Sequence, residues 1–135
     1  MRRYLLDTGI MGAFVDHNPS VVDRVREARQ RGDRIGTGMP VVCELYYGVE
    51  FSTIREENLR RLARGLSGIP CWPLDRKAAE EYGRLAAELR QLGRPMQQID
   101  IQIATIALTV GNCTVLSSDS DLAAVPGLTV ENWAK

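Results

Sequence analysis

The sequence has few of the residues on which small disulfide-bonded and zinc-binding proteins depend. Its 135 residues include three cysteines, which are far apart and form no Cys-x-x-Cys pair, and this argues against a disulfide framework or a zinc site. We expect Cys43, Cys71 and Cys113 to be buried, reduced thiols. The single histidine, His17, lies in a polar turn at residues 16–19, where we expect it to be solvated rather than catalytic.

Long apolar runs are also missing. The basic start at Arg2 and Arg3 is followed by an apolar run that ends at Asp7, which is too short for a secretory signal. The most apolar stretch, residues 99–116, contains Asp100 and other polar side chains, so we do not expect a transmembrane span. We therefore expect a cytoplasmic protein without a membrane segment.

The chain has no excess of either charge. Lys plus Arg and Asp plus Glu both number 17, which argues against a polybasic nucleic-acid coat and an acidic tail. The charges are nevertheless unevenly distributed, because Lys135 is the only basic residue after position 94. Three arginines, Arg60, Arg61 and Arg64, share helical spacing and form either a surface for RNA or a solvated charged face.

Short apolar runs alternate with longer stretches of helical periodicity. This alternation predicts a single α/β domain over residues 1–135, a three-layer sandwich with a mostly parallel sheet covered on both faces. Gly65 and Gly68 are expected to end the fourth helix, and Pro73 confines the third strand to an edge. We expect strands at residues 3–6, 34–37, 71–74, 113–116 and 128–130, and helices after Asp7 and over 20–31, 40–49, 56–66, 76–92 and 99–110.

Acidic residues follow the predicted strands, and in open α/β sheets ligands bind at the carboxyl ends of the strands. Asp7 follows the first strand and Asp119 the fourth, with Asp121 close behind, while Glu44 and Asp100 lie beside the apolar stripes of two helices. Each also has a simpler interpretation. Asp7 and Asp119 suit helix caps, Asp100 suits a first helical turn, and Glu44 suits the rim of a helix.

The segment around Asp100 contains no cation to neutralise it, because residues 95–134 include no Lys or Arg. Carboxylates held together near apolar surface repel one another unless protons or cations neutralise them. Oxygen ligands without nearby His or Cys favour Mg²⁺ or Mn²⁺ over zinc. The pattern therefore predicts an acidic site for a divalent metal.

Four segments in order along the chain resemble the motifs of PIN-domain ribonucleases, and most closely those of the VapC toxins of VapBC toxin-antitoxin pairs. The resemblance covers nearly the whole chain, including the ending at residues 125–133. The segments are Leu5-Leu6-Asp7-Thr8-Gly9-Ile10, Glu44-Leu45-Tyr46-Tyr47-Gly48, Asp100-Ile101-Gln102-Ile103-Ala104 and Ser117-Ser118-Asp119-Ser120-Asp121-Leu122.

The resemblance implies a PIN-like fold and a metal-dependent endoribonuclease acting as a toxin. By the same resemblance, Asp7, Glu44, Asp100 and Asp119 hold one or two Mg²⁺ or Mn²⁺ ions, with Asp121 as the alternative fourth ligand. RNA hydrolysis in this family leaves a 5′-phosphate and a 3′-hydroxyl.

The resemblance also implies two protein partners, a second copy in a homodimer and a VapB-like antitoxin. The helix over residues 40–49 carries more apolar side chains than one helix face needs, and these form either an interface or part of the core. They are Val41, Val42, Leu45, Tyr46, Tyr47 and Val49.

The sequence departs from the family pattern without losing a carboxylate. Gly9 stands where these toxins commonly carry Asn, which bears on substrate contacts or on hydration of the site. Ser117 and Ser118 replace a usual Thr and a polar or basic residue, and Leu122 replaces Phe.

Three other interpretations are open from the sequence. Asp7-Thr8-Gly9 resembles the Asp-Thr-Gly turn of small dimeric aspartic proteases, which are all-β proteins. A phospho-aspartate fold also uses acidic residues and Mg²⁺ but requires a lysine near the phosphoryl group, and Lys77 and Lys135 are poorly placed for that role. The third interpretation is a catalytically inactive PIN domain that serves only as a binding module.

Overall fold

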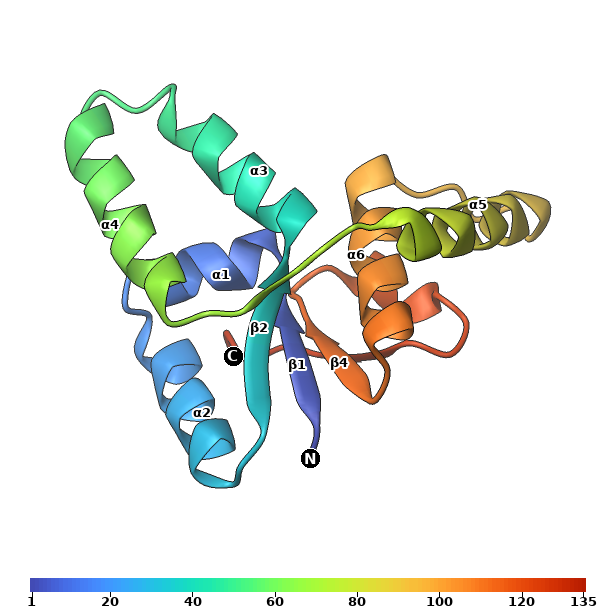
Figure 1. The fold of residues 1–135 in the computed structure, drawn as a ribbon, viewed down its shortest axis with the longest axis horizontal. Helices are drawn as coiled ribbons and strands as arrows, with labels where there is room; N and C mark the ends of the chain where they lie inside the picture. The colour runs from blue at the N-terminus through green and yellow to red at the C-terminus, as the bar shows by residue number, and fades with distance from the viewer.

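The computed structural model describes all 135 residues and contains one five-stranded sheet in the order β3-β2-β1-β4-β5 (Figure 1). Every neighbouring pair of strands is parallel, so the carboxyl ends of all the strands share one edge of the sheet. The prediction of a mostly parallel sheet is confirmed. The strands are β1 (Arg3–Leu6), β2 (Arg34–Gly38), β3 (Cys71–Trp72), β4 (Cys113–Leu116) and β5 (Thr129–Glu131).

Strand β1 lies at the centre of the sheet, where Leu6 is in register with Thr37 of β2 and with Leu116 of β4. The chain first extends the sheet on the β2 side of β1 and later returns to the β4 side. The order of the strands therefore reverses between β1 and β4. In open parallel sheets, this reversal leaves a crevice at the carboxyl ends of the two strands.

Helices cover both faces of the sheet, as the sequence predicts. In Figure 1, α1, α2 and α4 lie on one side of the strands and α5 and α6 on the other, while α3 extends from the carboxyl end of β2. Their bounds are α1 (Thr8–Val15), α2 (Pro19–Gln30), α3 (Met39–Val49), α4 (Arg55–Ser67), α5 (Arg76–Gln91) and α6 (Gln98–Val110), and a 3₁₀ turn, η1, spans Ser120–Ala124. None of these helices has the length and apolar composition needed to cross a membrane.

The core is a single cluster of 23 buried apolar residues between the sheet and the helices. The central strands contribute Leu5, Leu6, Val115 and Leu116, all fully buried. Because both faces of β1 and β4 are covered, these strands are continuously apolar rather than alternating. The core therefore holds the ends of β1 and β4 in a rigid frame.

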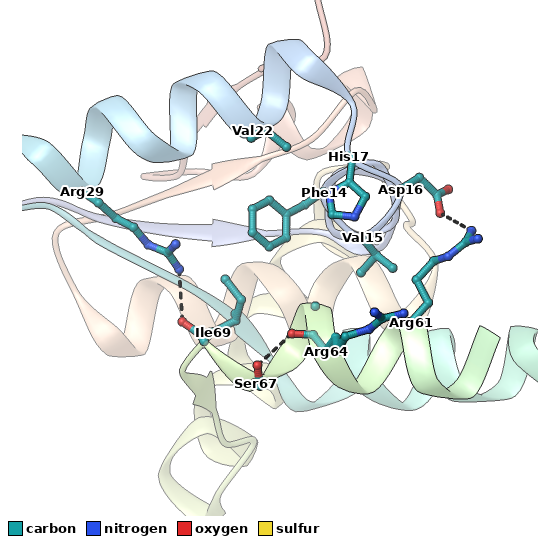
Figure 2. Close-up of a pocket in the computed structure, with 12 residues that line it drawn as sticks. Phe14, Val15, Asp16, His17, Val22, Arg29, Arg61, Arg64, Ser67 and Ile69 are labelled. Atoms are coloured by element: carbon teal, nitrogen blue, oxygen red, sulfur yellow. Dashed lines mark hydrogen bonds and ion pairs between the residues drawn. The ribbon is translucent and has the colours of Figure 1, made fainter. Parts of the chain in front are cut away.

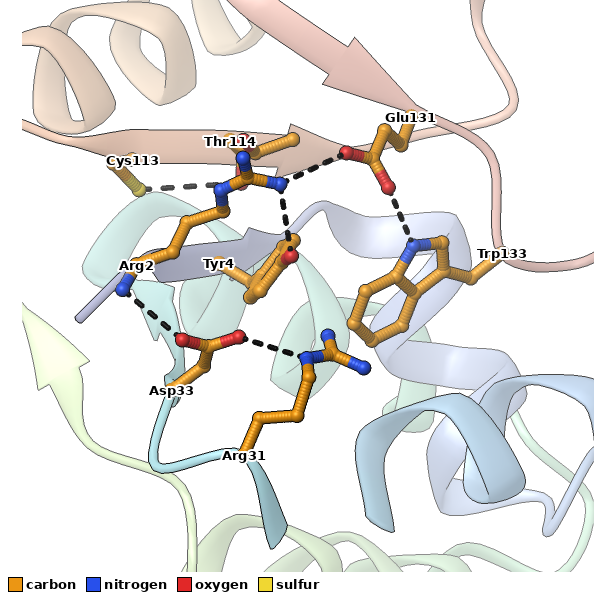
Figure 3. A network of polar contacts seen from close by, with 8 residues as sticks. All are labelled: Arg2, Tyr4, Arg31, Asp33, Cys113, Thr114, Glu131 and Trp133. Atoms are coloured by element: carbon orange, nitrogen blue, oxygen red, sulfur yellow. Dashed lines mark hydrogen bonds and ion pairs between the residues drawn. The ribbon is translucent and has the colours of Figure 1, made fainter. Parts of the chain in front are cut away.

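The segment after β5 packs against β1 through the polar and aromatic contacts in Figure 3. It is also hydrogen-bonded to α2. The ring of Trp133 packs against Tyr4 with centroids 4.7 Å apart, and its indole N–H donates to Oε1 of Glu131 over 3.0 Å. Arg2 donates to the Tyr4 hydroxyl over 3.2 Å and lies 3.7 Å from Glu131. The Ser20 hydroxyl in α2 donates to the Trp133 carbonyl over 2.7 Å. These contacts fix the C-terminal segment and so support the end of β4 beside it.

Two local predictions were wrong. Gly65 does not end a helix but lies inside α4, where a Cβ atom would come within 2.7 Å of Cγ2 of Val15. The glycine instead allows α4 to approach α1 closely, and only Gly68 terminates the helix. Strand β3 is shorter than predicted, although its place at the edge of the sheet is confirmed.

The prediction of buried thiols was also wrong for two of the three cysteines. Cys43 and Cys71 are exposed and Cys113 is half-buried, although all three are free. Burial raises the pKa of the Cys113 thiol to about 12. Cys43 lies in α3 and Cys71 in the edge strand β3, and apolar character alone did not reveal that these elements have an open side.

Candidate active site

Asp7 leaves the end of β1 and caps the first turn of α1. Its Oδ1 accepts a hydrogen bond from the Ile10 backbone N–H over 2.9 Å. Burial raises the pKa of the Asp7 carboxyl above its usual value, hydrogen bonds from the Ser117 hydroxyl and the Ile10 N–H oppose that rise, and the nearby carboxylates of Asp119 and Glu44 add to it. The cap predicted from the sequence is present, and it holds a half-buried acid at the strand end.

Asp119 follows β4, the strand next to β1, and caps η1. Its Oδ1 accepts from the Asp121 backbone N–H over 2.9 Å. Its own N–H donates to the hydroxyl oxygen of Ser117 over 2.9 Å. Since the buried Ser117 hydroxyl also hydrogen-bonds the Asp7 side chain, one serine connects the two strand ends. Both Asp119 and Asp121 are exposed.

Asp100 enters from the first turn of α6 and is half-buried. Burial raises the pKa of its carboxyl, and repulsion from Asp119, Asp7, Glu44 and Asp121 raises it further, in that order. Asp100 therefore lies within electrostatic reach of every other predicted site residue. The fold thus brings the four other predicted carboxylates close to Asp100.

Glu44 reaches the crevice from the second turn of α3 and is exposed. Its Oε1 accepts a hydrogen bond from the Thr8 hydroxyl at the start of α1. This contact joins segments separated by 36 positions in the chain. The predicted rim position of Glu44 is correct, and its side chain is turned toward the crevice by Thr8.

The donor set of the crevice consists of carboxylate oxygens, which suit a hard divalent cation. As the side chains are oriented in the structure, no three acidic, His or Cys side chains are arranged to hold a metal ion. Asp7, Asp119 and Glu44 are each engaged in a hydrogen bond to a neighbouring donor. The residues fit a divalent metal by the chemistry of their oxygen ligands and by their mutual repulsion.

The hydroxyl groups of Thr8 and Ser117 also contact these carboxylates, and the sequence did not indicate a role for either of them. Ser117 was noted only as a replacement for a usual Thr, yet that replacement keeps a hydroxyl at the position that connects Asp7 with Asp119. Gly9 is another departure from the family pattern. It leaves space beside Asp7, because a Cβ atom at position 9 would lie 3.8 Å from Oδ1 of Asp7.

The sequence and the fold match those of known proteins. A family model described as PIN domain matches residues 4–128. Ribonuclease VapC2 of Rickettsia felis is 30% identical over 132 residues, which cover 98% of both chains. This chain belongs to the PIN-domain family and to its VapC ribonucleases. A further relative, the tRNA(fMet)-specific endonuclease VapC of Shigella flexneri, is 31% identical over 134 residues, covering 99% of this chain and 100% of that one.

Solved VapC structures have the same fold as this PIN domain. VapBC2 of Rickettsia felis, bound to a DNA fragment from its promoter, matches with a TM-score of 0.89 at 29% identity and covers 97% of this chain and 98% of that one. The DNA-bound VapBC of Salmonella typhimurium also has a TM-score of 0.89, at 27% identity over 98% and 99% of the two chains. PIN-domain ribonucleases are in general dependent on divalent metals. This parallel, helix-covered fold excludes the all-β aspartic protease.

Proposed function

We propose that this PIN domain is a Mg²⁺- or Mn²⁺-dependent endoribonuclease and the toxin of a toxin-antitoxin pair. Asp7, Glu44, Asp100 and Asp119 are the proposed metal ligands, and Asp121 is the alternative to Asp119. Asp119 is preferred because it lies closer than Asp121 to the end of β4 and is connected to Asp7 through Ser117.

The observation that carries this proposal is the position of Asp100, which is half-buried in the first turn of α6 and lies close enough to the four other carboxylates to be repelled by them. A cluster of acids at the end of a parallel sheet with no Lys or Arg among them costs stability unless a cation neutralises it. The sequence identity to VapC ribonucleases over the full chain supports the same assignment.

A bound divalent metal supplies charge neutralisation, polarisation of the phosphodiester and a lowered pKa of water. The protein's carboxylates determine where this metal would be held. Asp7 and Asp119 hold fixed positions because each caps a helical turn, and Asp100 faces both of them. One carboxylate of the cluster accepts the proton of the attacking water, and hydrolysis leaves a 5′-phosphate and a 3′-hydroxyl.

Two partners follow from the assignment to the VapC ribonucleases. Because related structures are of VapBC complexes, we infer that a VapB-like antitoxin binds and inhibits this toxin. A homodimer is proposed through α3, whose exposed Tyr47 packs edge-to-face against Phe51 just after the helix, with ring centroids 5.0 Å apart. We place this activity in the cytoplasm, where RNA is available and the three free thiols stay reduced.

The proposal is tested by cleavage of a long RNA with Mg²⁺ or Mn²⁺ and with EDTA. Asp7→Asn should lower the cleavage rate by on the order of 10²-fold or more, because it removes a ligand charge, while Asn preserves the helix cap. Asp75→Asn is the matched control, since Asp75 caps α5 with the same 2.9 Å hydrogen bond and lies outside the crevice. Cleavage that resists EDTA, or an Asp7→Asn variant as active as Asp75→Asn, contradicts the proposal.

A further inference from the structure

A cavity of about 660 Å³ lies between the end of α1, α2 and α4, apart from the acidic crevice (Figure 2). None of the five carboxylates lines it. Its volume is within the range of small-molecule sites, about 300–1,000 Å³. Three arginines reach it, Arg29 from α2 and Arg61 and Arg64 from α4. The cavity is therefore large enough for a nucleotide and rich in cationic donors.

The three guanidinium groups differ in the hydrogen bonds and ion pairs that they make within the chain. Arg29 donates to the Gly68 carbonyl over 3.1 Å, and Arg61 lies 3.5 Å from Oδ1 of Asp16. The Arg64 side chain takes part in no hydrogen bond or ion pair within the chain, although it lines the cavity beside Arg61. Each guanidinium has five N–H donors, so the paired arginines keep free donors as well. A single carboxylate, Asp16, leaves the cavity with an excess of positive charge.

The close contact between α4 and α1 brings these arginines to the same cavity as an aromatic side chain. Gly65 permits that contact, because any larger residue would meet Val15. The half-buried Phe14 lines the same cavity, and Figure 2 shows its ring in the space between Arg29 and the arginines of α4. Arginines for phosphate together with an aromatic face for a base are the means by which proteins bind single-stranded nucleic acids.

A second cavity adjoins the arginine cavity on the side of the acidic crevice. This second cavity, of about 450 Å³, has Thr8 and Glu44 among its lining residues and shares Val15, Asp16 and Arg61 with the first. Its course follows α1, whose eight residues span about 12 Å at about 1.5 Å each. A single strand that follows α1 would therefore place the cleaved bond and the arginine cavity a few nucleotides apart.

We propose that the arginine cavity is a subsite for the RNA substrate, which binds the phosphate of a nucleotide a few positions from the cleaved bond through Arg64 and places its base against Phe14. This inference rests on the proposed endoribonuclease activity and adds the path of the RNA strand. This path explains how RNA, a polyanion, can bind beside an acidic crevice. The arginines that bind the RNA lie at the opposite end of α1 from the carboxylates.

Binding of a labelled 12-nucleotide single-stranded RNA, measured in EDTA over a range of salt concentrations, tests this subsite. Arg64→Gln should weaken binding by about 5- to 10-fold and reduce the slope of log affinity against log salt by about 0.7, the value for one lost phosphate contact. Arg60→Gln is the matched control, because Arg60 is exposed on the same helix and does not line the cavity. It should change neither quantity.

Cleavage kinetics give an independent measurement. Arg64→Gln should raise KM for RNA and leave kcat unchanged, since the cavity is remote from the carboxylates. The subsite is contradicted if Arg64→Gln and Arg60→Gln bind RNA with equal affinity. It is also contradicted if Arg64→Gln loses affinity for an acidic antitoxin peptide but not for RNA. Absence of metal-dependent cleavage by the wild type contradicts the endoribonuclease instead, and the comparison of RNA affinities still decides the subsite.

Discussion

The Thr8 hydroxyl donates a hydrogen bond to Oε1 of Glu44, which connects the first turn of α1 with the second turn of α3. Thr8 follows Asp7 directly, so this contact sets Glu44 beside the acid that ends β1. Glu44 is exposed on its helix, and a free side chain there would sample many rotamers. The hydrogen bond therefore positions the most mobile of the four proposed ligands.

Thr8→Val should weaken metal binding without unfolding the chain. Valine keeps the branched shape but removes the hydroxyl, and loss of a group that orients a metal ligand typically costs about 10–100-fold in metal affinity or activity. We expect the Mn²⁺ concentration that gives half-maximal RNA cleavage to rise by about 10-fold. Thr8→Ser, which restores the hydroxyl, should return it to the wild-type value. Equal values for valine and serine would show that the contact has no role.

Asp100→Asn should stabilise the metal-free protein at neutral pH. The pKa of Asp100 is raised in the folded state, so the folded chain binds that proton more tightly than the unfolded chain. The resulting stability is present below about pH 4 and is lost as the pH rises through the raised pKa. At pH 7 the ionised carboxylate is therefore destabilising, and its replacement by a neutral amide should raise Tm by about 2–4 °C.

Thermal unfolding in EDTA at pH 7 and at pH 4 measures this effect. The difference in Tm between Asp100→Asn and the wild type should shrink at the lower pH, where Asp100 is protonated. Addition of Mn²⁺ should then raise the Tm of the wild type but not of the variant, because binding to the folded state alone stabilises by about 2.7 kcal/mol at 100 times Kd. A variant that is less stable than the wild type in EDTA at pH 7 contradicts the argument.

Gly65→Ala and Gly9→Ala should have opposite effects on stability. A Cβ atom at position 65 would approach Val15 to 2.7 Å, and the branched valine has little freedom to move away, so we expect a loss of about 1–3 kcal/mol. At position 9 the nearest atom is 3.8 Å away, and alanine in the helix should gain about 0.5 kcal/mol. Urea denaturation of both variants measures the two changes. Equal stabilities would mean that α1 and α4 are not held in close contact.

Tyr47→Arg should weaken association while the chain stays folded. The Tyr47 side chain is exposed, and the residue retains 67% of its accessible surface in the single chain, so its replacement removes no core contact. An added charge at the centre of an apolar interface is costly. Sedimentation should therefore detect a larger fraction of monomer, and binding of the antitoxin should be compared in parallel. Leu92→Arg is the control, because Leu92 is also exposed, at 55%, and directly follows α5, away from α3.

Much of the fold followed from local patterns in the sequence. The apolar runs that form β1 and β4, the caps Asp7 and Asp75, and the stop at Gly111 were all predicted within one or two residues. These features depend on neighbours within a few positions, because capping hydrogen bonds and side-chain periodicity act over one or two turns. The order of the acids along the chain, matched to a family, was enough to select five carboxylates that interact electrostatically in the fold; their role as metal ligands stays a prediction.

The sequence alone thus determined the strand ends, the helix starts and the set of carboxylates, since each is a local property of the chain. The tertiary structure decided how they are joined: Ser117 between Asp7 and Asp119, Thr8 with Glu44, and Gly65 against Val15. It also placed the arginines of α2 and α4 around one cavity. These contacts join residues that are distant in the chain and depend on how the helices pack, which no local pattern encodes.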